Sequence, residues 1–267
     1  CAQTGVRTGS VTPRRIPVPA QTRAPNGETN AYVLGSDDAL LLDPATLTDD
    51  LATAIEACGV AHIAVTHHHP DHVGAVAECA REFDCAVWAR RGREAAFTAA
   101  TGVDPDHTFA PSETIPVGDG VDVLTTAGHA PEHVAFAVDD GYVSGDLAVA
   151  EGSVVVGAPE GDMRAYLSSL RRVHARGPEH LYPGHGPVVE APRATCRRLI
   201  THRLRRERAI SDAVEDGAET LDAIVDEAYD KDLSGVRDLA RVTVRAHLEK
   251  LAVEGHVVWD GKRTRPA

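Results

Sequence analysis

The sequence predicts an α+β fold, with one large mixed domain followed by a smaller helical one. Helix-like and strand-like segments alternate from about residue 28 to 100, and several short strand patterns follow between residues 121 and 144. The last part of the chain contains helical patterns that are followed by a short pair of strands. At 267 residues the chain exceeds the usual size of one domain. We predict an extended lead-in over 1–27, a core domain over 28–192 and a C-terminal domain over 193–267.

The N-terminal segments predict a lead-in, a hairpin and a helix. Four prolines among the first 27 residues favour an extended segment over a packed element. Apolar runs at residues 30–34 and 39–43 are separated by four turn residues, which is hairpin spacing. Thr48 is placed to cap a helix through residue 57, because two aspartates stand in the first turn, where the helix dipole favours them.

A rhythm of strand, helix and strand continues to about residue 100. The apolar run at residues 63–65 predicts a buried strand, residues 73–83 predict a helix, and residues 86–88 predict the next strand. A helix near residues 93–100 follows. The middle of the chain is richer in strands, predicted at residues 121–125, 134–138 and 142–144, before a helix over about 163–175.

The pattern past residue 192 resembles a winged-helix module. A strongly basic helix is predicted over residues 193–209. Residues 221–229 and 239–253 carry apolar side chains at the spacing of one helical face. Strand residues 257–258 and a turn complete the pattern.

The net charge of −13 indicates adaptation to the solvent rather than a cationic partner. Only 3 of the 27 basic residues are lysines. Concentrated salt screens the self-repulsion of an acidic surface, so we expect a halophilic, haloarchaeal source. The protein is expected to unfold at a higher temperature in molar KCl than in dilute buffer, which a thermal melt in each solvent measures.

The cysteines and the lengths of the apolar runs indicate in which cellular compartment the protein is located. Five cysteines, an odd number without disulfide or zinc-finger spacing, favour free thiols in a reducing compartment. No apolar run approaches the roughly 20 residues that cross a bilayer. We therefore expect a cytoplasmic protein with no membrane partner.

Residues 66–72, Thr-His-His-His-Pro-Asp-His, are the strongest functional signal. Four imidazoles and a carboxylate follow a buried strand directly, and such clusters are typical of metal sites. If the loop is extended, alternate side chains point the same way. His67 and His69 can then share one ion, while Asp71 and His72 turn toward a second.

Three later segments place a metal-capable side chain beside glycine. They contain Gly128-His129, Gly145-Asp146 and Gly184-His185. Glycine permits the tight backbone that lets a ligand approach from a loop. These segments are candidates for the remaining ligands of two ions.

Together the pieces resemble the metallo-β-lactamase fold superfamily over about residues 26–190. The resemblance rests on their order: the Asp that closes Leu40-Leu41-Leu42-Asp43, the HxHxDH run, and then the His, Asp and His that follow glycine. It implies a four-layer αββα sandwich, with Asp43 orienting a ligand by hydrogen bonding. It further implies a first metal held by His67, His69 and His129, a second held by Asp71, His72 and His185, and Asp146 bridging both.

The resemblance also implies the chemistry. Two zinc ions, or iron or manganese ions in their place, would lower the pKa of a shared water molecule and give a metal-bridging hydroxide nucleophile. Asp71 would be catalytic, holding the proton of that hydroxide. Of the other histidines, His68 is expected to point away from the metals. His133 is expected either to support the site or face the substrate, or else simply to pack at a strand end.

The substrate class stays open between two subgroups. The resemblance is nearest to glyoxalase-II-like thioesterases and to the β-lactamase-like protein 2 subgroup, which includes a single-strand-selective endoribonuclease. A thioester or a phosphodiester of single-stranded RNA is therefore the expected target, so the partner is a small molecule or a single-stranded nucleic acid. True β-lactamases lack an Asp equivalent to Asp146. A mononuclear-iron persulfide dioxygenase and a non-catalytic DNA-binding ligand sensor are the alternatives.

A run of arginines in the basic helix has two interpretations. Its side chains could contact phosphates of a nucleic acid, or form a solvated face that pairs with acidic groups. The domain could also wall off the active site or make a homodimer. The candidate residues are Arg197, Arg198, Arg203, Arg205, Arg206 and Arg208.

Overall fold

A computed structural model describes residues 12–117, 120–230 and 232–267. The chain forms two compact units that are each built from separate segments. The first unit comprises Cys1–Thr125, Glu132–Glu151 and Pro178–Pro192. The second comprises Thr126–Pro131, Gly152–Gly177 and Arg193–Ala267. The three-part division expected from composition stays a prediction.

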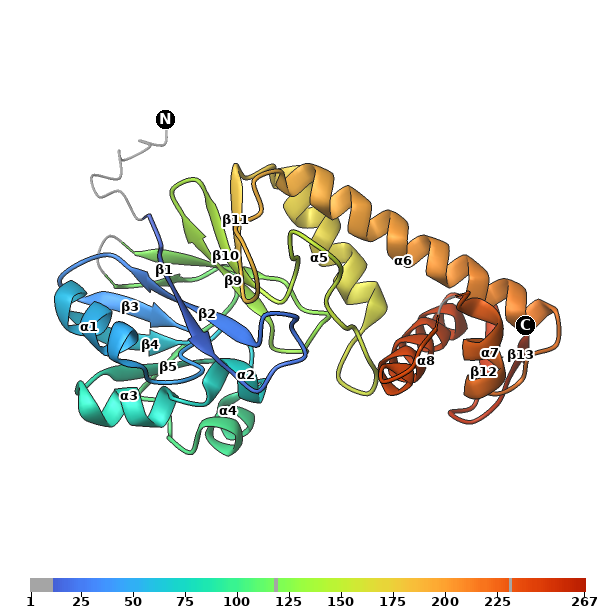
Figure 1. The fold of residues 1–267 in the computed structure, drawn as a ribbon, viewed down its shortest axis with the longest axis horizontal. Helices are drawn as coiled ribbons and strands as arrows, with labels where there is room; N and C mark the ends of the chain where they lie inside the picture. Colours follow the sequence, from blue (N-terminus) through green and yellow to red (C-terminus); the bar gives the residue numbers. More distant parts are fainter. Residues whose placement is uncertain (1–11, 118–119, 231) are drawn as a thin grey trace. The chain divides into compact units, whose positions relative to one another are not determined.

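The described residues of the first unit form two β-sheets (Figure 1). The first has six strands in the order β1-β2-β3-β4-β5-β6 and the second has five in the order β11-β10-β9-β8-β7. The strands of the first sheet are β1 (Arg14–Pro19), β2 (Glu28–Leu34), β3 (Ala39–Leu42), β4 (Val60–Ala64), β5 (Ala86–Arg90) and β6 (His107–Phe109). Those of the second are β7 (Thr114–Ile115), β8 (Val121–Thr125), β9 (Val134–Val138), β10 (Gly141–Gly145) and β11 (His180–Pro183).

Two hydrophobic clusters hold the layers of this unit together. The layers are, in order, a set of helices, the first sheet and the second sheet. One joins the two sheets and contains Tyr32 and Leu42 from the first and Phe136 and Val143 from the second. The other packs the opposite face of the first sheet against helices, with Leu51 among its members. These helices are α1 (Asp49–Cys58), α2 (Pro70–Val73), α3 (Val76–Glu82) and α4 (Glu94–Thr101).

Strand β1 corrects the expectation of a lead-in without packed elements. It pairs antiparallel with β2, and Ile16 and Val18 are buried in the core. Pro17 and Pro19 alternate with them and are exposed. Proline is tolerated there because β1 is an edge strand, which needs no ladder hydrogen bond on its outer side. Residues 1–11 lie outside the described residues.

Several local predictions are confirmed. Strands β2 and β3 form the expected antiparallel hairpin, and the Thr48 side chain accepts a hydrogen bond from Leu51 N at the start of α1. The helix expected over residues 73–83 corresponds to α3, which begins only at Val76, because Val73 is the last residue of the separate helix α2 and Gly74 follows it. A Cβ at that glycine would lie 2.5 Å from the Ala45 carbonyl oxygen, so the backbone packs too closely for a side chain. Strands β6 and β7 were not expected from the pattern.

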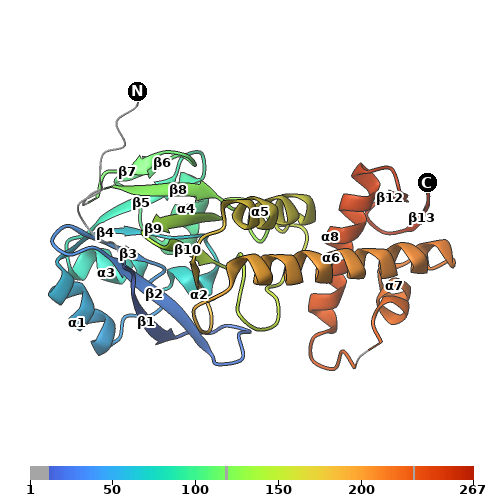
Figure 2. The ribbon, with the colours of Figure 1, turned by 90° about the horizontal axis from the view of Figure 1, so that it is seen from above.

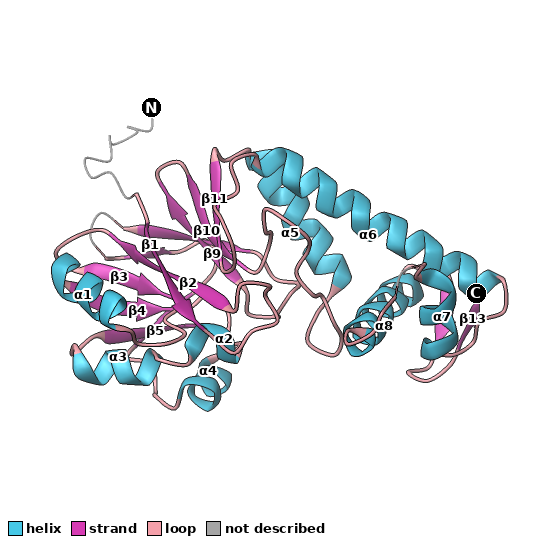
Figure 3. Ribbon diagram, viewed as in Figure 1, coloured by secondary structure: helices cyan, strands magenta, loops and turns pink. Residues whose placement is uncertain are grey.

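The second unit contains the C-terminal helices and a short hairpin (Figures 2 and 3). A hydrophobic cluster, with Ile210, Val225 and Leu248 among its members, joins three of the helices to the hairpin. The elements are α5 (Met163–Arg176), α6 (Pro192–Glu215), α7 (Leu221–Ala228), α8 (Arg237–Val253), β12 (Val257–Trp259) and β13 (Thr264–Pro266). Among the described residues, no helix combines the length and apolarity that a membrane span requires.

The cysteines that the structure describes are free. They are Cys58, Cys79, Cys85 and Cys196, and Cys1 lies outside the described residues. Burial raises the pKa of the Cys196 thiol to about 11 and that of Cys85 to about 11. Both thiols are therefore protonated at neutral pH and suited to packing rather than to nucleophilic chemistry.

A buried polar cluster links α6 to α8. Glu207 accepts hydrogen bonds from Lys250 Nζ at 2.7 Å and from His247 Nδ1 at 3.1 Å. Burial lowers the pKa of His247 and outweighs the opposing effect of Glu207. Burial alone would raise the pKa of Glu207, but the hydrogen bonds from His247 and Lys250 lower it. Both groups therefore bind protons less readily in the folded protein than in the unfolded chain.

Acid is expected to destabilise the second unit through this cluster. The unfolded chain binds a proton at His247 near pH ~6.5 while the folded protein resists it, so stability is lost as pH falls through about 6.5. Glu207 adds a loss at lower pH, as its folded carboxylate becomes protonated. Urea unfolding at pH 7.5 and 5.5 tests this, with a slope of at most about 1.4 kcal/mol per pH unit from His247. His247→Gln should flatten the dependence, whereas His256→Gln, at an exposed position, should not.

Candidate metal centre

The ends of parallel strands bring the candidate ligands together. Strands β3 and β4 run parallel with Leu42 opposite Ala64, so Asp43 and the HxHxDH loop leave the same edge of the first sheet. Strands β10 and β11 are also parallel, with Gly145 opposite Pro183. Asp146 and His185 therefore leave the second sheet at one edge.

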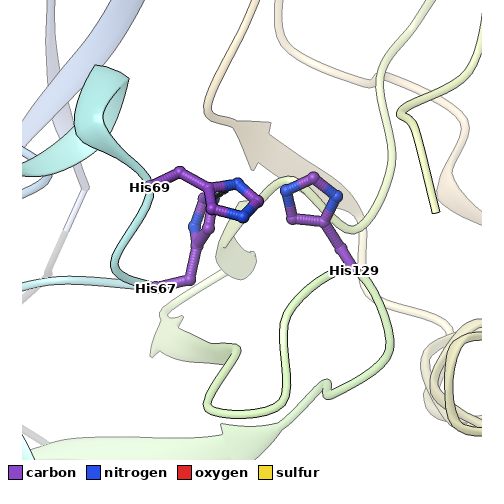
Figure 4. A group of neighbouring side chains, drawn as sticks. All are labelled: His67, His69 and His129. Carbon is purple, nitrogen blue, oxygen red and sulfur yellow. Dashed lines mark hydrogen bonds between the residues drawn. The ribbon is translucent and has the colours of Figure 1, made fainter. Parts of the chain in front are cut away.

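Three groups of side chains have ligand atoms within 4.8 Å of one another. In one of them the imidazoles of three histidines face each other (Figure 4). The groups contain all seven residues that the resemblance names as ligands. They are His67, His69 and His129; His67, His72 and Asp146; and Asp71, His72 and His185.

Asp43 organises the start of the loop. Its carboxylate is fully buried and accepts hydrogen bonds from Thr66 N at 2.7 Å and from Thr66 Oγ1 at 2.7 Å. Because Thr66 Oγ1 donates its one proton to Asp43, it acts as the acceptor for His67 Nδ1, 3.0 Å away. His67 then carries its proton on Nδ1 and presents the lone pair of Nε2. Asp43 has a φ of +54°, a left-handed conformation that aspartate tolerates better than most residues.

His72 is held by the same carboxylate. Its Nδ1 donates to Asp43 Oδ2 at 3.0 Å, while its Nε2 lies 3.6 Å from Asp146 Oδ1. Burial disfavours charge on His72, but the hydrogen bond to Asp43 and the charges of Asp43, Asp146 and Asp71 raise its pKa to about 9. Carboxylates that hold a proton on Nε2 equally favour a metal cation there.

Two further histidines are oriented by backbone carbonyls. His129 Nδ1 donates to Val155 O at 2.6 Å, and His185 Nδ1 donates to Glu28 O at 2.8 Å. Each therefore presents the lone pair of Nε2. Metal-bound histidines characteristically donate their other ring N–H to a carboxylate or carbonyl, as these do.

The residues present fit a metal ion on three observations. His72 Nε2 is buried without a hydrogen-bond partner among the described residues. His185 Nε2 lies 3.5 Å from Asp146 Oδ1 and 3.6 Å from Asp71 Oδ2, too far for good hydrogen bonds. His67 Nε2 and His69 Nδ1 are 3.1 Å apart, near the ~3.3 Å between two nitrogens bound tetrahedrally to zinc at about 2.0–2.1 Å.

Gly184 keeps this space open. A Cβ at this position would lie 2.5 Å from His72 Cε1 and 2.7 Å from Asp146 Oδ1. Gly184→Ala is therefore expected to displace both side chains and to weaken zinc binding by about 10- to 100-fold, the range known for disturbed ligand support. Competition with a chromophoric chelator measures the affinity. Gly186→Asn is the control, because a Cβ there meets nothing within 4 Å and asparagine tolerates the left-handed φ of +75° at this position; equal affinities in the two variants would contradict the expectation.

His68 and His133 lie outside the three groups. The expectation that His68 points away from the metals agrees with its position against Phe97, with ring centroids 5.5 Å apart. Burial lowers the pKa of His68. His133 is fully buried, and its Nε2 accepts a hydrogen bond from Asp146 N at 3.0 Å. It therefore holds the backbone of a candidate ligand and does not face solvent.

Sequence reasoning missed the supporting residues Asn30, Thr66 and Glu132. Asn30 Nδ2 donates to Pro183 O at 2.9 Å and Asn30 N to Gly184 O at 2.7 Å, which fixes the turn before His185. Glu132 accepts a hydrogen bond from His68 N at 3.0 Å and so fixes the backbone of the loop over residues 66–72. The one available signal was the polar Asn30 at the start of the otherwise apolar run over residues 30–34.

The candidate arginines of α6 are in two different environments. Arg203 is buried, donates to Val154 O, and lies 5.6 Å from the centroid of the Tyr166 ring. Arg206 stacks over the Tyr229 ring at 3.5 Å and donates to Ala228 O. The other four are exposed.

The sequence pattern of the Metallo-beta-lactamase superfamily matches residues 24–185. The chain belongs to this superfamily. It is 32% identical over 249 residues to a beta-lactamase-like protein 2 homolog of Drosophila melanogaster, covering 85% of this chain and 83% of that one. It is 28% identical over 193 residues to an atrochrysone carboxyl ACP thioesterase of Aspergillus fumigatus, covering 68% and 58% of the two chains.

Solved structures of the superfamily show the same fold. A metallo-beta-lactamase family protein of Thermus thermophilus has a TM-score of 0.76, with 23% identity over 96% of this chain and 98% of that one. A second structure, solved in a di-iron-bound form, has a TM-score of 0.52 and 29% identity over 65% and 93% of the two chains. As a member of this superfamily, the chain is a metal-dependent hydrolase.

Proposed function

We propose that the protein is a hydrolase that works with two bound metal ions, zinc by preference, and cleaves a thioester. The main support is the set of four histidines whose Nδ1 atoms are each held by an acceptor, so that four Nε2 lone pairs are available for metals. The three groups of candidate ligands overlap at His67 and at His72, so the first and the third group adjoin, as sites for two neighbouring ions would. A relative in di-iron-bound form is compatible with iron in the same positions.

The ions, when bound, supply a hydroxide nucleophile at neutral pH and stabilise negative charge on the substrate oxygen. The protein supplies orientation and a proton acceptor. Asp71 is 19% exposed at its side chain, whereas His72 is fully buried and Asp146 is 10% exposed. Asp71 can therefore exchange protons with solvent while it faces the ligand set, which suits it to hold and release the nucleophile's proton.

Thioester cleavage is preferred because relatives are named as thioesterases, one of them of an acyl carrier protein. A phosphodiester of single-stranded RNA is the competing substrate. We further propose a four-layer sandwich in the core, a winged-helix-like C-terminal domain, a halophilic source and a cytoplasmic location. A homodimer is compatible with these features.

A substrate panel tests the proposal. Zinc-loaded protein at high salt is offered an acyl thioester, a lactone, a phosphodiester and single-stranded RNA, with metal content measured in parallel. Two zinc ions per chain and cleavage of the thioester alone are expected. Cleavage of RNA would replace the substrate assignment. One iron with oxygen consumption on a persulfide would indicate a dioxygenase, and tight duplex-DNA binding without any turnover would indicate a ligand sensor.

A further inference from the structure

A hollow of about 720 Å³ lies on the second unit, beside the first half of α6. Five of its lining residues, Arg197, Arg198, Thr201, His202 and Arg205, follow helical spacing and so share one face of the helix. Gly152 and Ser153, from the segment before α5, also line it. The run of six arginines is thus divided, since the buried Arg203 and the half-buried Arg206 pack against tyrosine rings while three others line this hollow.

Two of the arginines of the hollow, Arg197 and Arg205, do not form the carboxylate pairs that the solvated-face interpretation requires. Within the described ranges, no hydrogen bond or ion pair joins Arg197 or Arg205 to an acidic side chain. Arg198 donates to the backbone oxygen of Gly152 at 2.7 Å. Elsewhere in the same unit arginines do pair, as Arg237 does with Asp226 at 2.6 Å. On a chain with a net charge of −13, positive charge gathered in one hollow indicates an external anion.

We propose that this hollow binds a small molecule that carries a diphosphate group. Arginine forks donate paired hydrogen bonds to phosphate oxygens, and the forks of Arg197 and Arg205 can satisfy several oxygens at once. The helix rises about 12 Å between these two residues, a separation that two long arginine side chains can bridge by converging on one small anion.

The lining favours a small molecule over a nucleic acid. Among the described residues, no Phe, Tyr or Trp side chain lines the hollow. Sites for single-stranded nucleic acid usually combine basic grooves with aromatic side chains on which bases stack. The volume also lies in the range of small-molecule pockets, about 300–1,000 Å³. This inference does not depend on the metal centre or on the proposed thioesterase activity.

Calorimetric titration of the full-length protein with inorganic diphosphate tests the site, in the lowest salt at which the protein stays folded. The double variant Arg197→Gln/Arg205→Gln is expected to weaken binding by at least about tenfold, because two charge-assisted contacts are lost. Arg208→Gln is the control. It removes a positive charge from an exposed position of the same helix that does not line the hollow, so its affinity should stay within about twofold of the parent.

Three outcomes would overturn the proposal. One is the absence of diphosphate binding by the parent protein. Another is an equal loss in Arg208→Gln, which would show attraction to overall charge instead of a site. The third is tight binding of a twelve-nucleotide single strand that diphosphate does not displace, which would assign the hollow to nucleic acid. Melting temperature and zinc content of each variant confirm that the fold and metal centre are intact.

Discussion

Replacing Asp71 by Asn is expected to lower turnover by about 10²- to 10⁴-fold, the usual contribution of a positioned proton acceptor. The carboxamide keeps the size of the side chain but cannot take up a proton or carry its negative charge. Asp71 follows Pro70 in the first turn of α2 and is partly exposed, so the substitution leaves no buried group unpaired. The melting temperature of the metal-free protein should therefore stay nearly unchanged.

Steady-state kinetics on the cleaved substrate, with metal content measured on the same sample, separates the two tasks of Asp71. Loss of turnover with metal retained indicates proton transfer, and loss of one metal equivalent indicates ligation. Asp50→Asn, at an exposed position of α1, is the control and should be fully active. An Asp71→Asn protein with parental activity and full metal content would contradict the assignment.

Replacing Asp43 by Ala is expected to weaken metal binding by about 10- to 100-fold, although Asp43 belongs to none of the metal groups. The variant removes the acceptor that fixes the Nδ1 proton of His72. It also leaves the buried Thr66 N–H and hydroxyl without their acceptor. Such losses should lower the free energy of unfolding by about 2–4 kcal/mol.

Zinc competition and urea unfolding measure the two effects of Asp43. Asp43→Asn refines the test, because its Oδ1 can still accept from Thr66 N while its amide nitrogen cannot accept from His72 Nδ1. It should therefore regain part of the stability but little of the metal affinity. Parental zinc affinity in Asp43→Ala would show that Asp43 does not support the ligands.

Predictions succeeded where neighbouring residues decide the outcome. The turn between residues 34 and 39 allows a hairpin whatever lies elsewhere, and the Thr48 cap depends on groups within one helical turn. The candidate ligands His67, His69, Asp71 and His72 are likewise close in the sequence, and their assignment to metals stays a prediction. The prolines of β1 led to a wrong prediction of an unpacked lead-in. A strand can contain these prolines because it pairs with β2 on one side only and its other side stays unpaired, which the local sequence does not show.

The sequence by itself determined the superfamily, the types of the candidate ligands and their order along the chain, because each motif is carried by adjacent residues. Asp43 was already expected to support a candidate ligand, but tertiary structure alone decided the other polar groups that do so. Thr66, Asn30 and His133 act through contacts set by sheet register and parallel strand ends, which no local pattern encodes. Tertiary structure also divided the arginines of α6. Arg203 and Arg206 pack against the rings of Tyr166 and Tyr229, whereas others line the hollow.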